Sequence, residues 1–316
     1  MSIGFLFPGQ GAQSPQMLQP IRSYGIDVSE VFQEVSEGCG FDVEKLIETS
    51  NKELLSKTQY TQIVMYACDM AYYKILKELG VSPDWVAGHS LGQYAALTAS
   101  GVLDLFEAGC LIKQRSMLMD KVTREGKLCA ISSPTLEIDI LDKLCKEIEK
   151  GIHKCIRIAL YNSNRQVVVG GEPDAITEFA ERASELENYK IKILPVGQAF
   201  HTPIMDEMIE EFQEHVNKLN LHKPNVPIIL NCTGEFLNVE HYDTAVREEM
   251  LKQCNQPVQW MKTMQLMIEE KTQSVMEAGP GHSLCGLLKN MTKDIKSYHM
   301  DERRTVMKFL KEYRSI

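Results

Sequence analysis

The sequence has no long hydrophobic run, since no stretch approaches the roughly 18–20 apolar residues of a membrane-spanning helix. Its first residues, MSIGFLFPGQGAQ, lack the basic segment and the cleavage site of a signal peptide. We therefore expect a protein of the cytoplasm that does not associate with a membrane.

Nine cysteines are present, but none forms a CxxC pair with another, and their number is odd. Both features argue against a disulfide framework and against a zinc cluster. We expect reduced cysteines that are mostly buried as small apolar side chains.

An excess of positive charge is also missing. The chain has 34 Lys and Arg residues against 43 Asp and Glu residues, a net charge of −9, which argues against a general nucleic-acid binder. No repeat or low-complexity linker interrupts the 316 residues, of which 44% are hydrophobic. These values predict a folded globular protein with one large domain, or with a main domain into which a smaller one is inserted.

The N-terminal part predicts two buried strands, each followed by a glycine-containing turn. The apolar run at 3–7 ends in Pro8-Gly9, and Trp85-Val86-Ala87 leads through a turn into an Ala-rich helix. Between them, residues 58–80 carry apolar side chains at helical spacing and end in a glycine, which predicts a long packed helix.

Residues 127–197 follow a different order, in which apolar runs and two charged helical segments alternate as β-α-β-β-α-β. The apolar runs are 128–133, 155–160, 166–171 and 191–196. This is the order of a ferredoxin-like unit, which can be inserted into a larger chain as a subdomain. We therefore predict a large domain made of 1–126 and 198–316 and a small subdomain at 127–197.

After this unit, helical and apolar segments alternate again. The expected helices are 205–219, 241–253, 258–270, one from about 283 and one around 302–314, and the expected strands are 226–231, 274–279 and 295–300. Such alternation predicts an α/β fold with a mostly parallel sheet and helices on both faces.

One motif predicts a nucleophile. Gly88-His89-Ser90-Leu91-Gly92 fits G-x-S-x-G, in which a serine lies on a sharp turn between a strand and a helix, and both elements are expected here. The helix dipole and the Leu91 amide would favour the oxyanion that forms when Ser90 attacks a carbonyl group. We therefore expect Ser90 to be a nucleophile.

A serine nucleophile needs a base, and the sequence offers eight histidines. Five of them have polar neighbours and are expected at the surface: His153, His215, His222, His241 and His299. His89 adjoins Ser90, but successive side chains in a turn diverge, so we expect it to make a structural hydrogen bond. From spacing alone, His201 and His282 both remain candidates for the base.

Two further segments are candidates for binding. The loop at 9–13 follows the first strand, so it lies at the carboxyl end of the sheet and is placed to supply a second amide to an oxyanion. Arg115 lies in a mainly apolar helical segment, and a buried arginine needs a carboxylate or several acceptors. Without further context, a partly exposed Arg115 with no ligand is the alternative.

Six segments together resemble the malonyl-CoA:acyl carrier protein transacylase family in order and spacing, over almost the whole chain. They are Pro8-Gly9-Gln10-Gly11-Ala12-Gln13, Gly88-His89-Ser90-Leu91-Gly92, Gln114-Arg115, Ala199-Phe200-His201, Gln253 in QCNQPV, and Glu277-Ala278-Gly279-Pro280-Gly281. The resemblance implies an α/β-hydrolase-like large domain that is interrupted by a ferredoxin-like small one.

The resemblance also implies catalytic roles. Ser90 would accept the acyl group, and His201 rather than His282 would be the base. A main-chain carbonyl would orient His201, with Gln253 as helper. The amides of Gln10 and Leu91 would form the oxyanion hole.

For the substrate, the resemblance assigns the malonyl carboxylate to Arg115 and places Asn162 in the lining of the same cleft. Phe200 resembles the malonyl-selecting version of its motif, in which a bulky side chain leaves no room for a 2-methyl group. Gln93, His282 and Asn164-Arg165 depart from the Glu, Lys and Pro-Gly that are common in the family. These departures affect the cleft rather than the proposed reaction.

The implied reaction is ping-pong transfer of a malonyl group from malonyl-CoA to the phosphopantetheine thiol of an acyl carrier protein, for fatty acid synthesis, without a metal or redox cofactor. Carrier proteins are usually acidic, so a local basic cluster would be needed for docking. The candidates are Lys190, Lys192, Lys289, Arg303 and Arg304.

Four alternatives remain open. One is a discrete acyltransferase that serves a polyketide synthase, and another loads the carrier of a malonate decarboxylase. A third is a serine hydrolase or thioesterase that uses the same Ser90 and His201, and a fourth is a scaffold that binds a carrier protein without catalysis.

Overall fold

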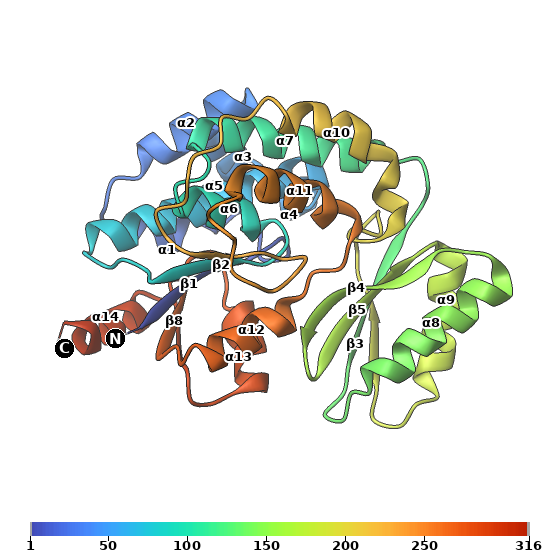
Figure 1. Cartoon of the computed structure of the whole chain (residues 1–316). Helices are drawn as coiled ribbons and strands as arrows, with labels where there is room; N and C mark the ends of the chain where they lie inside the picture. The colour runs from blue at the N-terminus through green and yellow to red at the C-terminus, as the bar shows by residue number, and fades with distance from the viewer. Residues whose placement is uncertain (1, 315–316) are drawn as a thin grey trace.

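A computed structural model describes residues 2–314, which form two separate sheets (Figure 1). The larger sheet has five strands, and every neighbouring pair is parallel. In spatial order they are β7 (Ile228–Ile229), β2 (Trp85–Gly88), β1 (Ile3–Phe7), β8 (Ser274–Glu277) and β9 (Lys296–His299). The carboxyl ends of all five strands therefore lie at one edge of the sheet, where sites of open α/β folds gather.

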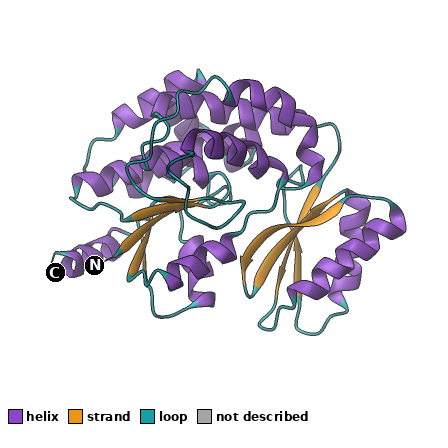
Figure 2. Ribbon diagram, in the orientation of Figure 1, coloured by secondary structure: helices purple, strands orange, loops and turns teal. Residues whose placement is uncertain are grey.

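Side chains alternate between the two faces of the sheet along each strand, and helices bury both faces. In β1, Phe5 and Phe7 contact Tyr73 of α5 (Thr58–Glu78) edge-on, with ring centroids 6.2 and 6.1 Å from that of Tyr73. Leu6 instead packs with Trp260 and Leu284 in a second core cluster on the opposite face. Figure 2 shows the resulting helices above and below the sheet.

The helices of this part of the chain cover the sheet as the alternation predicts. The face of Phe5 carries α5 (Thr58–Glu78), and the opposite face carries α12 (Trp260–Glu269) and α13 (Ser283–Met291). The others are α1 (Leu18–Arg22), α2 (Ser29–Cys39), α3 (Val43–Thr49), α4 (Lys52–Leu55), α6 (Gly92–Ala99), α7 (Leu105–Lys121), the 3₁₀ helix η1 (Pro203–Met208), α10 (Ile209–Val216), α11 (Tyr242–Asn255) and α14 (Arg303–Tyr313).

The second sheet is antiparallel, in the order β4-β5-β3-β6. Its elements follow the chain as β3 (Lys127–Ser132), α8 (Ile138–Ile152), β4 (Ile156–Ser163), β5 (Gln166–Gly171), α9 (Pro173–Ser184) and β6 (Lys190–Ile193). Helices α8 and α9 pack on its outer face and share a core cluster of their own with the strands (Figure 1). The order β-α-β-β-α-β and this topology confirm the predicted ferredoxin-like unit.

Main-chain hydrogen bonds join the two parts next to β4. Tyr161 N–H donates to Val258 O over 2.9 Å, and Val258 N–H donates to Ala159 O over 3.0 Å. The small sheet is thereby tied to the segment between α11 and α12, at the carboxyl edge of the larger sheet.

Several predicted elements have different bounds, such as the strand expected at 191–196, which ends at Ile193, and two of them lie next to the candidate site. The strand expected at 226–231 pairs only over Ile228–Ile229, because Leu230 already belongs to a turn, in which it accepts from Gly234 N–H. The helix expected at 205–219 begins as the 3₁₀ helix η1 at Pro203 and ends at Val216. In both cases the chain turns at the edge of the candidate site.

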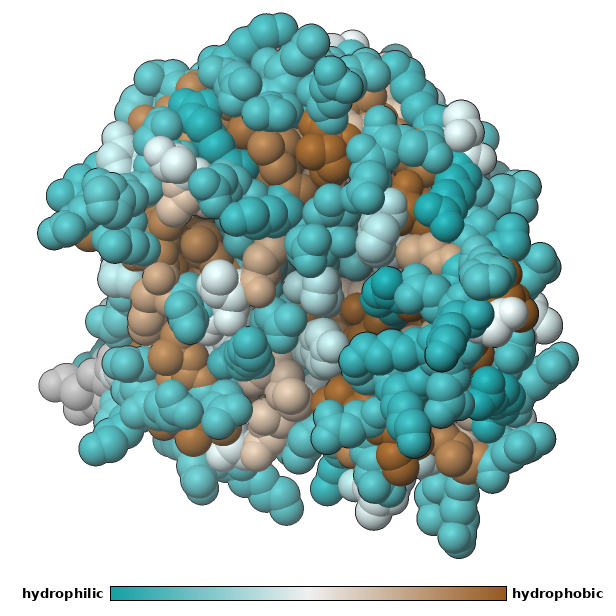
Figure 3. Space-filling model, turned by 45° about the vertical axis from the view of Figure 1, so that its right-hand side comes forward, coloured by the Kyte–Doolittle hydropathy of each residue, from teal (hydrophilic) through white to brown (hydrophobic). Residues whose placement is uncertain are grey.

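The nine cysteines are free, and all but Cys110 and Cys232 are buried, as the sequence predicts. None of the helices within residues 2–314 is both long and apolar enough to cross a membrane. Figure 3 shows one face of the molecule, on which hydrophilic side chains dominate and apolar ones appear in separate patches.

Candidate active site

Ser90 lies on the sharp turn that the motif predicts, between the end of β2 at Gly88 and the start of α6 at Gly92. Its φ angle is 54°, in the left-handed region that side chains rarely adopt. The flanking glycines are required by close backbone contacts: a Cβ on Gly88 would lie 1.9 Å from Gly92 O, and one on Gly92 would lie 2.0 Å from Phe7 O. The turn therefore presents Ser90 at the N-terminus of a helix.

His201, and not His282, is the histidine at Ser90. Its Nε2 lies 2.7 Å from Ser90 Oγ, and its Nδ1 lies 2.6 Å from the main-chain oxygen of Gln253. Because a carbonyl oxygen can only accept, Nδ1 carries the proton and Nε2 is left to accept from the serine hydroxyl. His282 instead lies against His299, with ring centroids 5.0 Å apart.

Burial and the nearby positive charge of Arg115 lower the pKa of His201 to about 3. The imidazole is 3% exposed and therefore neutral at neutral pH. It is consequently in the protonation state that a general base requires.

Arg115 of α7 is buried, with 2% of its surface exposed. Its Nη1 donates to Gln62 Oε1 over 2.6 Å, its Nη2 donates to Gln253 Oε1 over 3.0 Å, and its guanidinium lies 5.3 Å from the centre of the Tyr94 ring. Nε is buried without a partner, and no carboxylate of residues 2–314 forms an ion pair with this guanidinium. A buried cation that is held only by neutral groups favours an anionic ligand.

The loop after β1 lies against the serine turn. A Cβ on Gly9 would be 2.8 Å from His89 O and 3.6 Å from Ser90 Cβ, so the loop that carries Gln10 lies against the Ser90 turn. Within residues 2–314, the main-chain N–H groups of Gln10 and Leu91 have no hydrogen-bond partner. Both amides are therefore available to an oxyanion.

The small subdomain reaches the site through Asn162 on β4. Its Oδ1 lies 2.9 Å from His89 Nε2, and its Nδ2 donates to Gln166 Oε1 over 3.0 Å. His89 thus makes the structural hydrogen bond that the sequence analysis expects. Phe200 is 5% exposed and directly precedes His201.

Sequence reasoning missed two buried amides at this site, Gln62 and Asn231. Gln62 holds Arg115, and Asn231 Oδ1 accepts from Ser90 N–H over 2.7 Å. A signal existed for Asn231, because it ends an apolar run at the carboxyl edge of the sheet. Gln62 lies in the helical segment 58–80, and spacing alone does not distinguish it from an ordinary helix residue. No cluster of three or more His, Cys, Asp or Glu side chains within residues 2–314 is arranged to hold a metal ion.

A strained serine at the start of a helix, with a histidine on its hydroxyl and two free amides beside it, is the arrangement of enzymes that pass an acyl group through a serine ester. The family model for the acyl transferase domain matches residues 4–313. The chain belongs to the malonyl-CoA:acyl carrier protein transacylase family.

Two relatives of known name align with nearly the full length of this chain. The malonyl CoA-acyl carrier protein transacylase of Bacillus subtilis is 33% identical over 304 residues, which cover 95% of this chain and 74% of that protein. That of Escherichia coli K12 is 29% identical over 299 residues, with 94% and 95% covered.

Solved structures of malonyl transacylases have the same fold. The malonyl-CoA:acyl carrier protein transacylase of Xanthomonas oryzae has a TM-score of 0.92 at 29% identity and covers 99% of both chains. A malonyl-transacylase in complex with its type II PKS acyl-carrier protein has a TM-score of 0.91 at 27% identity, with 99% of this chain and 100% of that chain covered. The α/β class, with a parallel sheet and a separate antiparallel one, is thereby shared with solved members of the family.

Proposed function

We propose that this enzyme transfers a malonyl group from malonyl-CoA to the phosphopantetheine thiol of an acyl carrier protein, through a malonyl ester on Ser90. The observation that carries the proposal is the buried guanidinium of Arg115. Neutral amides hold it, and one of them, that of Gln253, also hydrogen-bonds to Ser90 O. A planar guanidinium fits a carboxylate with two parallel hydrogen bonds. An acyl group that ends in a carboxylate matches this site, whereas a neutral acyl group leaves the charge without a partner.

In the first half of the reaction, His201 Nε2 takes the proton of Ser90 Oγ as Oγ attacks the thioester carbonyl carbon. The amides of Gln10 and Leu91 hold the negative oxygen of the tetrahedral intermediate. When this intermediate collapses, the carbon–sulfur bond breaks, and His201 returns the proton to the leaving CoA sulfur. A malonyl ester of Ser90 remains.

In the second half, the carrier thiol gives its proton to His201 and attacks the ester carbonyl. The carbon–oxygen bond to Ser90 breaks, and His201 returns the proton to Ser90 Oγ. The malonyl carboxylate stays on Arg115 throughout, so this binding energy holds the reacting carbon in place in both steps.

The names of the relatives support a carrier protein as acceptor, because they are malonyl transacylases and one was solved with an acyl-carrier protein. We place the reaction in fatty acid synthesis. A cytoplasmic location remains part of this proposal, and nine free cysteines are consistent with a reducing compartment.

The carrier-protein surface and the domain boundaries are also proposed. The candidates for docking lie on three elements: Lys190 and Lys192 on β6, Lys289 on α13, and Arg303 with Arg304 at the start of α14. We keep 127–197 as the small subdomain and 1–126 with 198–316 as the large domain, a division that the separate core cluster of the small sheet supports.

The test is to incubate the purified protein with malonyl-CoA alone and to measure its intact mass, with Ser90→Ala and acetyl-CoA as comparisons. We expect a malonyl adduct that requires Ser90 and is weak with acetyl-CoA. Adding a phosphopantetheinylated carrier protein should then discharge it. Steady hydrolysis of malonyl-CoA without an adduct would favour the hydrolase instead, and no reaction with either thioester would refute the proposed substrate.

A further inference from the structure

The main chain on both sides of Ser90 is held by two buried side-chain amides, those of Asn231 and Gln253. Asn231 Oδ1 accepts from Ser90 N–H over 2.7 Å, and Gln253 Nε2 donates to Ser90 O over 2.7 Å. These contacts hold the two peptide planes that meet at the Ser90 Cα atom. Such external support is what a left-handed φ angle on a serine needs in order to persist.

Asn231 uses its full hydrogen-bonding capacity at this point. Besides accepting from Ser90 N–H, Oδ1 accepts from Gln253 Nε2 over 3.3 Å. Nδ2 donates to Gly88 O over 2.5 Å and to Gln93 Oε1. An asparagine amide has two donors and two acceptor positions, so all four are occupied. A flipped amide would place an N–H group against Ser90 N–H and an oxygen against Gly88 O, so only one orientation fits.

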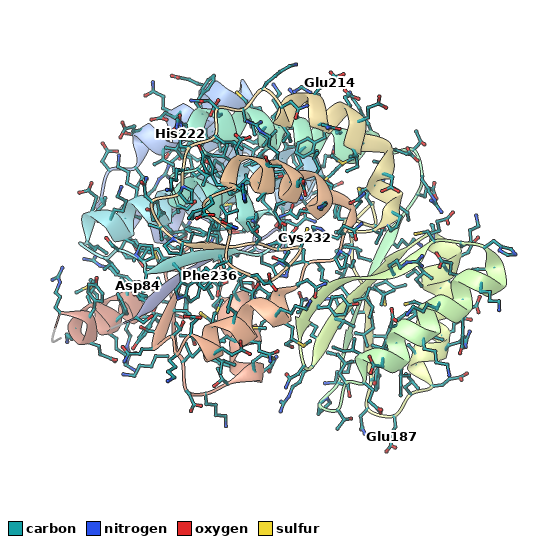
Figure 4. All side chains as sticks on the ribbon, in the orientation of Figure 1. Asp84, Glu187, Glu214, His222, Cys232 and Phe236 are labelled. Carbon is teal, nitrogen blue, oxygen red and sulfur yellow. The ribbon has the colours of Figure 1, made fainter. Side chains whose placement is uncertain are left out.

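The main chain of Asn231 is fixed as well. Gln259 N–H donates to Asn231 O over 2.7 Å, and the next residue, Cys232, donates its N–H to the buried carboxyl of Glu249 over 2.9 Å. Figure 4 labels Cys232, which lies beneath α11, the helix that carries Glu249 and Gln253. Asn231 is 1% exposed and is therefore a rigid support for the serine turn.

The direction of the Leu91 amide depends on the same network. Ser90 C=O and Leu91 N–H belong to one peptide plane and point in opposite directions, so the bond from Gln253 Nε2 to Ser90 O also sets where Leu91 N–H points. Asn231 Oδ1 accepts from Gln253 Nε2, and it also accepts from Ser90 N–H, which belongs to the peptide plane between His89 and Ser90. A rotation of the serine turn would move both Ser90 Oγ and the Leu91 amide.

We propose that Asn231 is a positioning residue of this enzyme. It holds the serine turn so that Ser90 Oγ stays within hydrogen-bonding distance of His201 Nε2 and the Leu91 amide faces the reacting carbonyl. Asn231 acts through the main chain and touches no substrate. Gln93, where the family commonly has Glu, takes part by accepting from Asn231 Nδ2. The inference rests on the proposed acyl transfer for its role, but its geometry concerns the nucleophile alone.

The experiment compares Asn231→Leu and the isosteric Asn231→Asp with the wild type. The readouts are the single-turnover rate of Ser90 malonylation, the KM for malonyl-CoA, and the rate of labelling by a fluorophosphonate. The fluorophosphonate reacts with an activated serine without needing Arg115. The control is Ile176→Ala, a truncation in the separate core of the small subdomain, which lowers stability without touching the serine turn.

We expect Asn231→Leu to slow malonylation and fluorophosphonate labelling by about 10²-fold each, because small misplacements of reacting groups cost rates of this size. KM for malonyl-CoA should change less than about threefold, since Arg115 keeps its place. Asn231→Asp keeps the acceptor for Ser90 N–H, but its second oxygen faces Gly88 O and fits there only when it is protonated and donates, so we expect a loss of about 10-fold.

The proposal is wrong if both variants react within about threefold of Ile176→Ala at equal folded fraction, since changes that small match lost stability rather than lost positioning. If Asn231→Leu does not fold, Asn231→Asp carries the comparison. If the wild type is labelled by the fluorophosphonate but forms no malonyl ester, the proposed function fails, whereas the labelling rates still decide the role of Asn231.

Discussion

Arg115 is linked to Ser90 through a single side chain, that of Gln253. The Gln253 amide accepts from Arg115 Nη2 over 3.0 Å and donates to Ser90 O over 2.7 Å, while its main-chain oxygen accepts from His201 Nδ1. The group proposed to bind the substrate carboxylate and the two groups proposed to do the chemistry therefore share one residue. Replacing Arg115 should therefore also change the pKa of His201.

Replacement of Arg115 should remove the preference for malonyl. Hydrogen bonds to charged groups contribute roughly 1.5–3 kcal/mol, so we expect kcat/KM for malonyl-CoA to fall about 10²-fold in Arg115→Met. The value for acetyl-CoA should not fall, because acetyl has no carboxylate. Arg182→Met, at a surface ion pair with Glu147, is the matched control. Equal losses for both thioesters would show that Arg115 supports the fold rather than the substrate.

The pH dependence of Ser90 reactivity should reflect the lowered pKa of His201. A base acts in its deprotonated form, so the rate of fluorophosphonate labelling should stay level from pH 8 down to about 5 and fall only as the pH approaches the His201 pKa of about 3. In Arg115→Met the nearby positive charge is gone, so the pKa of His201 should rise and the acid limb should move to higher pH. An acid limb near pH 6.5 in the wild type would contradict this prediction.

Phe200 should exclude a 2-methyl group. The side chain is buried directly before His201, and we expect Phe200→Ser to raise kcat/KM for methylmalonyl-CoA relative to malonyl-CoA by about 10-fold, as a single methyl group can contribute in a shaped pocket. Phe106→Ser, at a phenylalanine that is 47% exposed, is the control. An unchanged ratio would assign the selection to another residue.

Asp69 should make the protein less stable as the pH rises. Both carboxyl oxygens are buried without a hydrogen-bond partner, and burial raises the pKa of Asp69 well above 3.8, with a further contribution from Glu277. Because the folded state holds this proton more tightly than the unfolded state, the contribution to stability is complete below about pH 4 and is lost as the pH rises toward the folded-state pKa.

Asp69→Asn cannot ionise, so its stability relative to the wild type should grow by up to about 1.4 kcal/mol for each pH unit above 4. Urea unfolding at pH 4, 6 and 8 measures this difference. Asp243→Asn, at an exposed ion pair whose aspartate pKa is lowered, should show no such growth between pH 4 and 8, because the stability linked to that carboxylate is lost only below about pH 4. A constant difference between Asp69→Asn and the wild type would show that Asp69 ionises freely in the folded protein.

Local features could be predicted from the sequence because their causes are local. The order of helices and strands follows from apolar spacing, and the turn at Ser90 follows from glycines at 88 and 92 that admit close backbone contacts. The ferredoxin-like unit is recognisable for the same reason, since its element order is complete within about 70 residues. The resemblance to the family then named the site residues one by one.

The tertiary structure decided what depends on residues far apart in the chain. Spacing did not separate His201 from His282, because contact between Ser90 and a histidine 111 positions away depends on how the two parts of the chain pack. The same holds for Asn231 and Gln62, whose amides have no distinguishing local pattern and acquire their roles from the buried groups they meet. The sequence by itself determined the order of the elements and the candidate nucleophile Ser90, and only the fold brought His201, Arg115 and the supporting amides to one edge of the sheet.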